Sequence, residues 1–259
     1  MSKQGIVIAY TGSKGGVAKS TMTQLMATFL VYLKELKVLV IDADYDQGSI
    51  YEDRLGDKKK FEADEIKASY DVKLIPPNEV LDGIDMFKKK YDVIFIDLAG
   101  TKMAYGNVES YAAMDKMIIP FSFQKKENNK AKDFYKFLVD EVIPARLDAG
   151  LDIPDIVGQL VKISKNSLEY KELVKAKSKY NGKMEEIVEK NMENILGGVE
   201  EDQYEHQDYL YPFIILDASI TYAEAKFGRH LNTVMDESNA DIIERYENEL
   251  EEVYKYIIA

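Results

Sequence analysis

Cysteine is absent from the 259-residue sequence, and histidine occurs only twice, at His206 and His230. Without cysteine the chain can form no disulfides, iron–sulfur clusters or zinc sites with thiolate ligands. Two histidines so far apart in the sequence also argue against a catalytic zinc site. The composition therefore excludes a disulfide-stabilised domain and a metal centre with thiolate ligands.

Long apolar runs are missing as well. No stretch of about 18 apolar residues occurs, the length at which a segment becomes a candidate for a membrane-spanning helix. The first five residues lack the pattern of a secretory signal. The closing segment 240–258 carries Glu247, Glu249, Glu251 and Glu252, which anionic lipid would repel. We therefore expect a cytoplasmic protein that is not attached to a membrane.

Positive charge is in deficit, because the formal net charge is −12. Such a balance argues against a strongly basic nucleic-acid-binding protein. The charge is uneven, however: residues 162–183 are rich in lysine, whereas residues 185–208 are rich in acids. Two interpretations of this contrast stay open, namely two solvated helical faces of opposite sign or a local basic patch that contacts DNA weakly.

The sequence does contain an alternation of strand-like and helix-like runs. Hydrophobic residues make up 46% of the chain and charged residues 31%, which suits a soluble domain with a substantial core. Strand, helix and strand follow one another within residues 5–42, and this βαβ order predicts a parallel sheet. We expect one α/β domain over residues 1–259: a doubly wound, mostly parallel sheet flanked by helices, with a helical insertion at about 164–210.

Residues 9–21, AYTGSKGGVAKST, form the stretch around which this arrangement is organised. An apolar strand precedes the stretch and a helix-like run follows it, which is the context of a phosphate-binding loop. Backbone N–H groups of such a loop and the positive end of the next helix can surround a polyphosphate. Gly15 and Gly16 would let the backbone approach the anion. Lys19 would reach the terminal phosphates, and Ser20 would offer its hydroxyl to Mg²⁺.

The strict pattern G-x-x-x-x-G-K-[ST] is not met, because its two glycine positions fall on Ser13 and Ala18. Instead, residues 14–21 resemble the deviant Walker A loop, K-G-G-x-G-K-[ST]-T, of the ParA/MinD family of ATPases. In that family the extra lysine, here Lys14, reaches across a nucleotide-sandwich dimer to the partner's phosphates. By this comparison alanine at position 18 is a mild departure that adds one methyl group near the phosphates. The resemblance implies an ATP-binding loop made of Ser13, Lys14, Gly15, Gly16, Val17, Ala18, Lys19, Ser20 and Thr21.

Carboxylates follow two other apolar strands. Residues 38–42 end in Asp42, with Asp44 just beyond, and the apolar run 93–96 is followed by Asp97. Carboxylates at the carboxyl ends of strands beside a phosphate loop are placed to manage a metal or an attacking water. Asp97 reads as a Walker B aspartate, which binds Mg²⁺ directly or through water.

The first of these segments extends the resemblance. Residues 42–49 are similar to the family's switch I motif, D-x-D-P-Q-G-[NS], although Tyr45 and Asp46 stand where a single proline is usual. The similarity implies that Asp44 orients or activates the hydrolytic water and that Asp42 supports the Mg²⁺ shell. The departure puts the geometry of the switch in question more than the identity of Asp44.

Later parts of the chain are similar to the family more loosely. Residues 97–100 resemble its D-x-[PA]-[PG] motif, and residues 217–225 resemble its segment IPRNVRLAEA without the Pro-Arg pair. The family often has an asparagine that reads adenine after the strand expected here at 156–161, and Asn166 is the candidate. The resemblance implies the catalytic residues Lys14, Lys19 and Asp44 and the metal-binding residues Ser20, Asp42 and Asp97.

The remaining elements are predicted from periodicity and from proline. We expect helices over 21–36, 80–90, 107–114, 128–147, 168–180, 184–196 and 240–258. We expect further strands over 72–75, 116–120 and 213–216, the first two ended by proline. Residues 54–70 read as an exposed connection with a helix or two.

The resemblance implies a ParA-like ATPase that partitions or positions plasmid or other mobile DNA. ATP would bridge two subunits, the homodimer would bind DNA nonspecifically, and a partner protein of the ParB type would stimulate slow, Mg²⁺-dependent hydrolysis. The protein would then associate with the nucleoid. Two alternatives stay open: a MinD-like positioning ATPase for a protein cargo without direct DNA contact, which the acidic balance favours, and a nucleotide-binding regulator with negligible hydrolysis.

Overall fold

The computed structural model describes residues 4–12, 18–45, 47–61, 70–98, 107–121, 125–160, 233 and 237–258. Some sequence-based expectations lie outside these residues: the loop residues 13–17, Asp46, residues 99–100, Asn166, the insertion 164–210 and the segments 213–216 and 217–225. Within the described part, no helix is long and apolar enough to cross a membrane.

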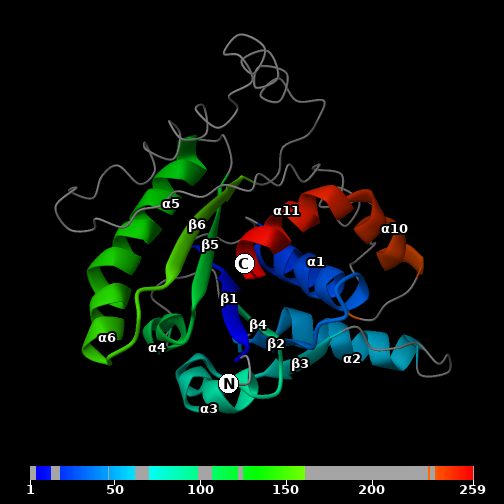
Figure 1. Ribbon diagram of the computed structural model, residues 1–259, viewed down its shortest axis with the longest axis horizontal. Coiled ribbons are helices and arrows are strands. Elements are labelled where there is room, and N and C mark those ends of the chain that lie inside the picture. Colours follow the sequence, from blue (N-terminus) through cyan, green and yellow to red (C-terminus); the bar gives the residue numbers. More distant parts are fainter. Residues whose placement is uncertain are drawn as a thin grey trace, which may run out of the picture.

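A sheet of six parallel strands forms the centre of the described structure, in the order β3-β2-β4-β1-β5-β6 (Figure 1). The strands are β1 Ile6–Tyr10, β2 Val38–Asp42, β3 Asp71–Leu74, β4 Val93–Asp97, β5 Lys116–Phe121 and β6 Asp155–Leu160. Every residue of β2 and β4 is buried, as expected for strands covered on both faces. The predicted doubly wound, mostly parallel sheet is confirmed.

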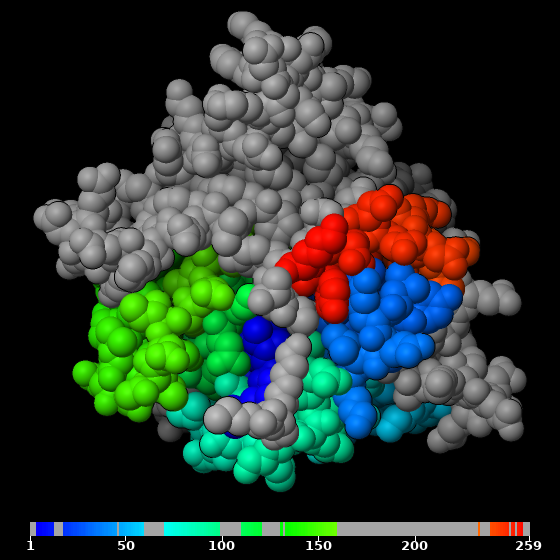
Figure 2. All heavy atoms as spheres, viewed as in Figure 1, coloured from blue at the N-terminus to red at the C-terminus, as the bar shows by residue number. Residues whose placement is uncertain are grey.

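Helices cover both faces of this sheet (Figure 1). Their bounds are α1 Lys19–Tyr32, α2 Ser49–Phe61, the 3₁₀ turn η1 Pro77–Glu79, α3 Val80–Lys88, α4 Asn107–Ala112, α5 Lys125–Phe137, the π-helical segment η2 Leu138–Val142, α6 Ile143–Asp148, α10 Glu237–Arg245 and α11 Glu247–Ile258. One face carries α1, α10 and α11, and the packed side chains include Ile8, Phe29, Phe95 and Leu250. In Figure 2 the C-terminal helices lie against α1.

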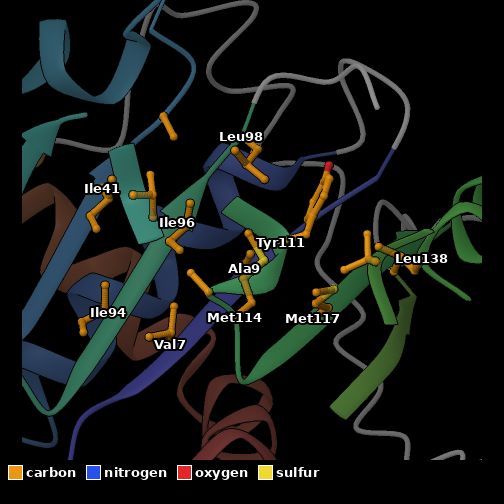
Figure 3. Close-up of a cluster of buried hydrophobic side chains, with 14 of the residues drawn as sticks. Val7, Ala9, Ile41, Ile94, Ile96, Leu98, Tyr111, Met114, Met117 and Leu138 are labelled. Atoms are coloured by element: carbon orange, nitrogen blue, oxygen red, sulfur yellow. The ribbon is translucent and has the colours of Figure 1, made fainter. Parts of the chain in front are cut away.

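The opposite face carries α3, α4, α5 and α6. Its core is drawn in Figure 3, where side chains of the central strands meet those of the surrounding helices. The labelled members are Val7, Ala9, Ile41, Ile94, Ile96, Leu98, Tyr111, Met114, Met117 and Leu138. Because successive strand residues point to opposite faces, Val7 and Ala9 belong to this core whereas Ile8 and Tyr10 belong to the other.

The predicted helix 128–147 is present, but it is longer than predicted and changes character midway. The N–H of Ile143 donates to the carbonyl of Leu138, five residues earlier, within η2. Pro144 follows immediately; it has no N–H for a helical bond, and its ring would crowd the carbonyl of Asp140 in a regular α-helix. The wider turn relieves that conflict. One side of this segment is apolar and buried, and it includes Phe134, Phe137, Leu138 and Val142.

The prediction of one closing helix over 240–258 is wrong, because the segment forms two helices that meet at Tyr246. The N–H of Tyr246 lies 3.2 Å from the carbonyl oxygens of both Ile242 and Ile243. This break lets α10 and α11 each turn an apolar side against α1. The apolar residues Ile243, Tyr246, Leu250 and Val253 are buried in this packing.

Pro120 does not end its strand, contrary to the prediction, because β5 continues to Phe121. The N–H of Thr11 donates to the carbonyl of Ile118 at 2.8 Å, so the backbone groups of Ile118 face β1. Residues two apart in a strand direct their backbone groups to the same side, and Pro120 therefore points its nitrogen past the end of β1. The missing N–H removes no bond of the ladder.

The prediction of an exposed connection with a helix or two over 54–70 is confirmed in its helix, but the predicted exposure is wrong at Arg54. Residues up to Phe61 belong to α2, and the Arg54 side chain is only 4% exposed. The charge of arginine favours the surface, so its burial here depends on partners that are distant in the sequence.

Candidate functional site

The carboxyl ends of β1, β2 and β4 lie at one edge of the sheet (Figure 1). The described members of the predicted site, among them Lys19, Ser20, Asp42, Asp44 and Asp97, belong to this edge. Asp42 and Asp97 are paired residues at the ends of β2 and β4. Helix α1 begins at Lys19, after β1 and the loop. The edge next to the point where an open parallel sheet reverses its strand order is where such folds bind ligands.

Ser20 and Asp97 join the phosphate-loop motif to the Walker B motif. The hydroxyl of Ser20 donates to Oδ2 of Asp97 at 2.7 Å. Asp97 is 2% exposed, and its Oδ1 has no hydrogen-bond partner among the described residues. Burial raises the pKa of Asp97 to about 7, the Ser20 hydroxyl opposing the rise. The cost of burying the charged carboxyl group of Asp97 is thus only partly offset by the Ser20 hydroxyl and the positive charge of Lys19.

Lys19 supplies positive charge at the same edge. Its side chain is buried, and this burial lowers its pKa, whereas the carboxylates of Asp97 and Asp44 act in the opposite direction. The ammonium group therefore lies within the electrostatic reach of both aspartates. A lysine at this position can neutralise the charge of a bound polyphosphate while the carboxylates hold it in its charged form.

Asp42 is buried at the end of β2. Its Oδ2 accepts a hydrogen bond of 3.0 Å from the N–H of Tyr51, in the first turn of α2. Burial raises the pKa of Asp42, and the N–H groups of Tyr51, Ile50 and Asp44 oppose the rise. Its Oδ1 has no partner within the described ranges. Asp42 thus holds the start of α2 with one oxygen and leaves the other for the site.

Asp44 lies in a tight turn between β2 and α2. Its carbonyl accepts the N–H groups of Gln47 at 3.0 Å and Gly48 at 2.6 Å. Gly48 has φ +54°, a left-handed conformation that glycine adopts without a Cβ clash. Tyr45, which stands where the family has proline, is 54% exposed. The turn therefore closes without the proline.

Ala18 departs from the family more seriously than the sequence suggests. It has φ 67° and ψ 22°, the left-handed helical conformation, immediately before the first residue of α1. In this conformation the Cβ of an L-residue crowds the following carbonyl, at a cost of roughly 1–2 kcal/mol. The expectation of a mild departure, in which only a methyl group is added, is therefore wrong, because the backbone is strained as well.

A Mg²⁺ ion fits the residues at this edge. A serine hydroxyl and carboxylate oxygens are the hard oxygen ligands that Mg²⁺ prefers, and two buried carboxylate oxygens lack partners here. The described residues contain no group of three or more His, Cys, Asp or Glu side chains suited to a metal. Such a group is not required, because proteins usually bind Mg²⁺ through one or two carboxylates together with substrate phosphates and water molecules.

Thr11 and Tyr111 belong to the surroundings of this site, although the sequence did not single them out. Thr11 is fully buried directly after β1, and its backbone N–H is fixed on Ile118. Burial raises the pKa of Tyr111 to about 12, while the neighbouring Thr11 side chain opposes the rise. The sequence held one signal for Thr11, namely its hydroxyl side chain between the first strand and the glycine-rich loop, and it held none for Tyr111.

The family model described as the CobQ/CobB/MinD/ParA nucleotide binding domain matches residues 8–205 of the chain. The search of curated proteins with this chain found no match.

Three solved structures illustrate the similarity of fold. A putative plasmid partition protein from Borrelia burgdorferi B31, bound to AMPPNP, is 20% identical in sequence to this chain, with a TM-score of 0.55. The alignment covers 98% of this chain and 100% of that protein. The pNOB8 ParA bound to nonspecific DNA is 19% identical with a TM-score of 0.52, covering 94% and 99%. The cell division ATPase MinD of Pyrococcus furiosus is 15% identical with a TM-score of 0.56, covering 97% and 99%.

These identities indicate a shared fold, whereas the family match extends from β1 past the last described strand, β6. It includes the phosphate-loop segment, both aspartate-bearing strands and α1. The chain belongs to the CobQ/CobB/MinD/ParA family of nucleotide-binding domains.

Proposed function

We propose that this protein is a Mg²⁺-dependent ATPase that dimerises around bound ATP and partitions or positions plasmid or other mobile DNA. One observation carries the ATPase part of the proposal, namely the contact of Ser20 with Asp97 beside Lys19. A hydroxyl, a carboxylate and an ammonium group at the end of a phosphate loop form the arrangement that phosphoryl transfer needs. Membership of a nucleotide-binding family supports the same conclusion.

In this proposal the loop 13–19 and the start of α1 bind the triphosphate, and Lys19 neutralises its terminal charge. Ser20 and Asp97 hold Mg²⁺, with Asp42 supporting them; the ion, when bound, screens the charge of the phosphates. Asp44 accepts a hydrogen bond from the attacking water and orients it, and Asn166 reads the adenine. Positioning and charge stabilisation are the main demands of this reaction, and these side chains supply both.

Dimerisation and DNA binding are the second part of the proposal. Lys14 of each subunit extends to the triphosphate of the other, so that ATP closes the dimer. The Borrelia structure with AMPPNP and the pNOB8 structure with nonspecific DNA, both of the same fold, support a nucleotide-dependent association with DNA. A partner of the ParB type would then stimulate the slow hydrolysis. The place of action would be the cytoplasm, on the nucleoid.

A second candidate is a positioning ATPase that moves a protein cargo and does not touch DNA. The net charge of −12 favours it, because a chain of this charge is repelled by phosphates unless its lysines are gathered on one surface. Lys130 and Lys136 are exposed on α5, together with Asp133. This mixture does not separate the two candidates.

Gel filtration provides the test. The full chain is run with Mg-ATP, with Mg-ADP and without nucleotide, and then with nonspecific duplex DNA. We expect a dimer only with ATP and co-elution with DNA that is lost at high salt. Lys14→Ala should remain a monomer while still binding ATP.

A chain that stays monomeric under saturating Mg-ATP, even with turnover blocked by Asp44→Ala, would contradict the dimer and with it the DNA-partitioning proposal. A dimer that ignores DNA would favour the protein-cargo candidate. Binding without turnover would indicate a regulator.

A further inference from the structure

We propose that Arg54 and Asp57 of α2 form a latch on Thr233, and that this latch transmits nucleotide occupancy to the C-terminal helices α10 and α11. The inference rests on the proposed function, because it assumes that nucleotide and Mg²⁺ bind beside Asp42 and Asp44. Arg54 and Asp57 lie within the family match, whereas Thr233, α10 and α11 lie beyond its end at residue 205.

The first step is the attachment of α2 to the site. Oδ2 of Asp42 holds the N–H of Tyr51, and the carbonyl of Asp44 holds the N–H groups of the turn that leads into the helix. The N–H of Glu52 in turn donates to the carbonyl of Gly48 at 2.8 Å. A ligand that displaces Asp42 or Asp44 must therefore displace the first turn of α2.

The second step is the latch itself. Arg54 and Asp57 are three positions apart and lie on one side of α2. Nε of Arg54 donates to Oγ1 of Thr233 at 2.8 Å, and Nη2 donates to the Thr233 carbonyl at 2.7 Å. Oδ2 of Asp57 accepts from the N–H of Thr233 at 2.6 Å and from its hydroxyl at 2.8 Å. Every polar group of Thr233 is thus bonded to α2.

The third step is the burial of these groups. Thr233 is fully buried, and Arg54 is 4% exposed with its guanidinium 5.0 Å from the centre of the Tyr70 ring. Nη2 of Arg54 also donates to the Tyr70 carbonyl, immediately before β3. In such surroundings a fully bonded polar network is rigid, whereas a partly broken one leaves charges without partners. The contact is therefore expected to move as a unit.

The fourth step leads back to the nucleotide. Thr233 lies shortly before α10, and α10 and α11 pack on α1, the helix that begins with Lys19 and Ser20. At the other end of α1, Lys34 pairs with Glu251 of α11 at 2.5 Å. Hydrogen bonds thus connect Asp42 to α2 and α2 to Thr233, which stands four positions before α10 in the sequence. Helices α10 and α11 in turn pack on α1, on the same side of the sheet as α2 (Figure 1).

This series of connections begins at one half of the proposed nucleotide site and ends at the other half. Asp42 and Asp44 lie at one end, and Lys19 and Ser20 lie at the other. If bound nucleotide draws these two halves together while α2 and Thr233 stay latched, the helices between them must rearrange. The surface of α10 and α11 would then report the nucleotide state to a partner of the protein.

The test is hydrogen–deuterium exchange of α11, residues 247–258, in the full chain with and without Mg-AMPPNP, whose binding is measured separately by calorimetry. In the wild type we expect nucleotide to change the exchange rate about fivefold or more, the lower end of typical coupling between sites. Thr233→Val keeps the shape of the side chain and removes its two hydroxyl bonds. It should abolish the change while AMPPNP affinity stays within about threefold, because no latch residue touches the nucleotide.

Two comparisons separate the latch from a general loss of structure. Thr233→Ser restores the hydroxyl and should restore the nucleotide effect. Lys34→Gln breaks an ion pair between the segment that follows α1 and Glu251 of α11, outside the latch. It should therefore speed exchange in both states yet preserve the difference between them. If Thr233→Val fails to fold, Asp57→Asn is used in the same way, because it removes the charge opposite the buried Arg54.

The outcomes are distinct. A folded Thr233→Val protein that binds AMPPNP and shows the wild-type change in α11 would overturn the latch, and so would a wild type that binds AMPPNP without any change there. Either result leaves the proposed ATPase function standing. A wild type that binds no nucleotide removes the proposed function and the latch together.

Discussion

The hydroxyl of Ser20 lies 2.7 Å from a carboxylate oxygen of Asp97, although 77 positions separate the two residues in the sequence. Each residue belongs to a different sequence motif. The phosphate loop is a specific signal by itself, whereas one aspartate after an apolar strand is a weak one. Their contact at the edge of the sheet shows that the two sequence patterns belong to one site. The start of α1 lies on one side of this site and the end of the Walker B strand, β4, on the other.

Replacing Ser20 with alanine tests its assignment to Mg²⁺. The substitution should weaken the apparent Mg²⁺ affinity of the ATPase about tenfold or more, because a ligand position near the metal typically matters by this amount. Ser20→Thr keeps the hydroxyl and should stay near the wild type. The measurement is ATPase rate against Mg²⁺ concentration at saturating ATP. Equal Mg²⁺ curves for Ser20→Ala and the wild type would remove Ser20 from the metal site.

Lys19 and Asp44 should separate binding from turnover. Lys19→Ala removes the charge that we propose neutralises the triphosphate and should abolish ATP binding, as measured by calorimetry. Asp44→Ala should leave binding intact and lower the hydrolysis rate by about a hundredfold or more, the effect of losing a group that orients the reacting water. An Asp44→Ala protein that turns over at the wild-type rate would disprove that role.

The pKa of Asp97 predicts how stability depends on pH in the absence of nucleotide and Mg²⁺. Burial raises the pKa of Asp97 from its ordinary value of 3.8 to about 7 in the folded chain. Between these values the folded chain holds a proton that the unfolded chain has released, so stability falls as pH rises and stays low above pH 7. The loss is at most about 4 kcal/mol, from 1.36 kcal/mol for each unit.

Asp97→Asn cannot ionise and should escape this loss. Its stability advantage over the wild type should therefore grow between pH 4 and pH 7 in urea unfolding experiments. Asp82→Asn, which removes an exposed carboxylate from α3, should follow the wild-type profile. Parallel profiles for Asp97→Asn and the wild type would mean that the buried carboxyl is already compensated.

Ala18→Gly tests the strain before α1. Glycine adopts φ 67° without a Cβ clash, so the substitution should stabilise the protein by about 1 kcal/mol. Ala27→Gly, in the regular part of α1, is the matched control and should destabilise by about 1 kcal/mol, since glycine is a poor helix former. Unfolding by urea measures both. Two changes of the same sign would contradict the strain at Ala18.

Local features could be predicted from the sequence because they depend on neighbouring residues. The apolar runs that became β1, β2 and β4 could be predicted from composition, and β2 and β4 also end in aspartate. The phosphate loop was predicted from its lysines, its glycines and its flanking elements. The alternation of strands and helices predicted a parallel sheet because a crossover must return each strand in the same direction. Asp42, Asp44 and Asp97 were found in this way.

The tertiary structure alone decided the rest. Arg54 reads as a surface charge in the sequence, yet Thr233 and Tyr70 enclose it, and no local pattern contains those partners. The left-handed backbone of Ala18 and the break at Tyr246 likewise follow from how α1 must leave the loop and be covered. Periodicity records which side of an element is apolar; which distant element covers that side is set by the packing of the whole chain.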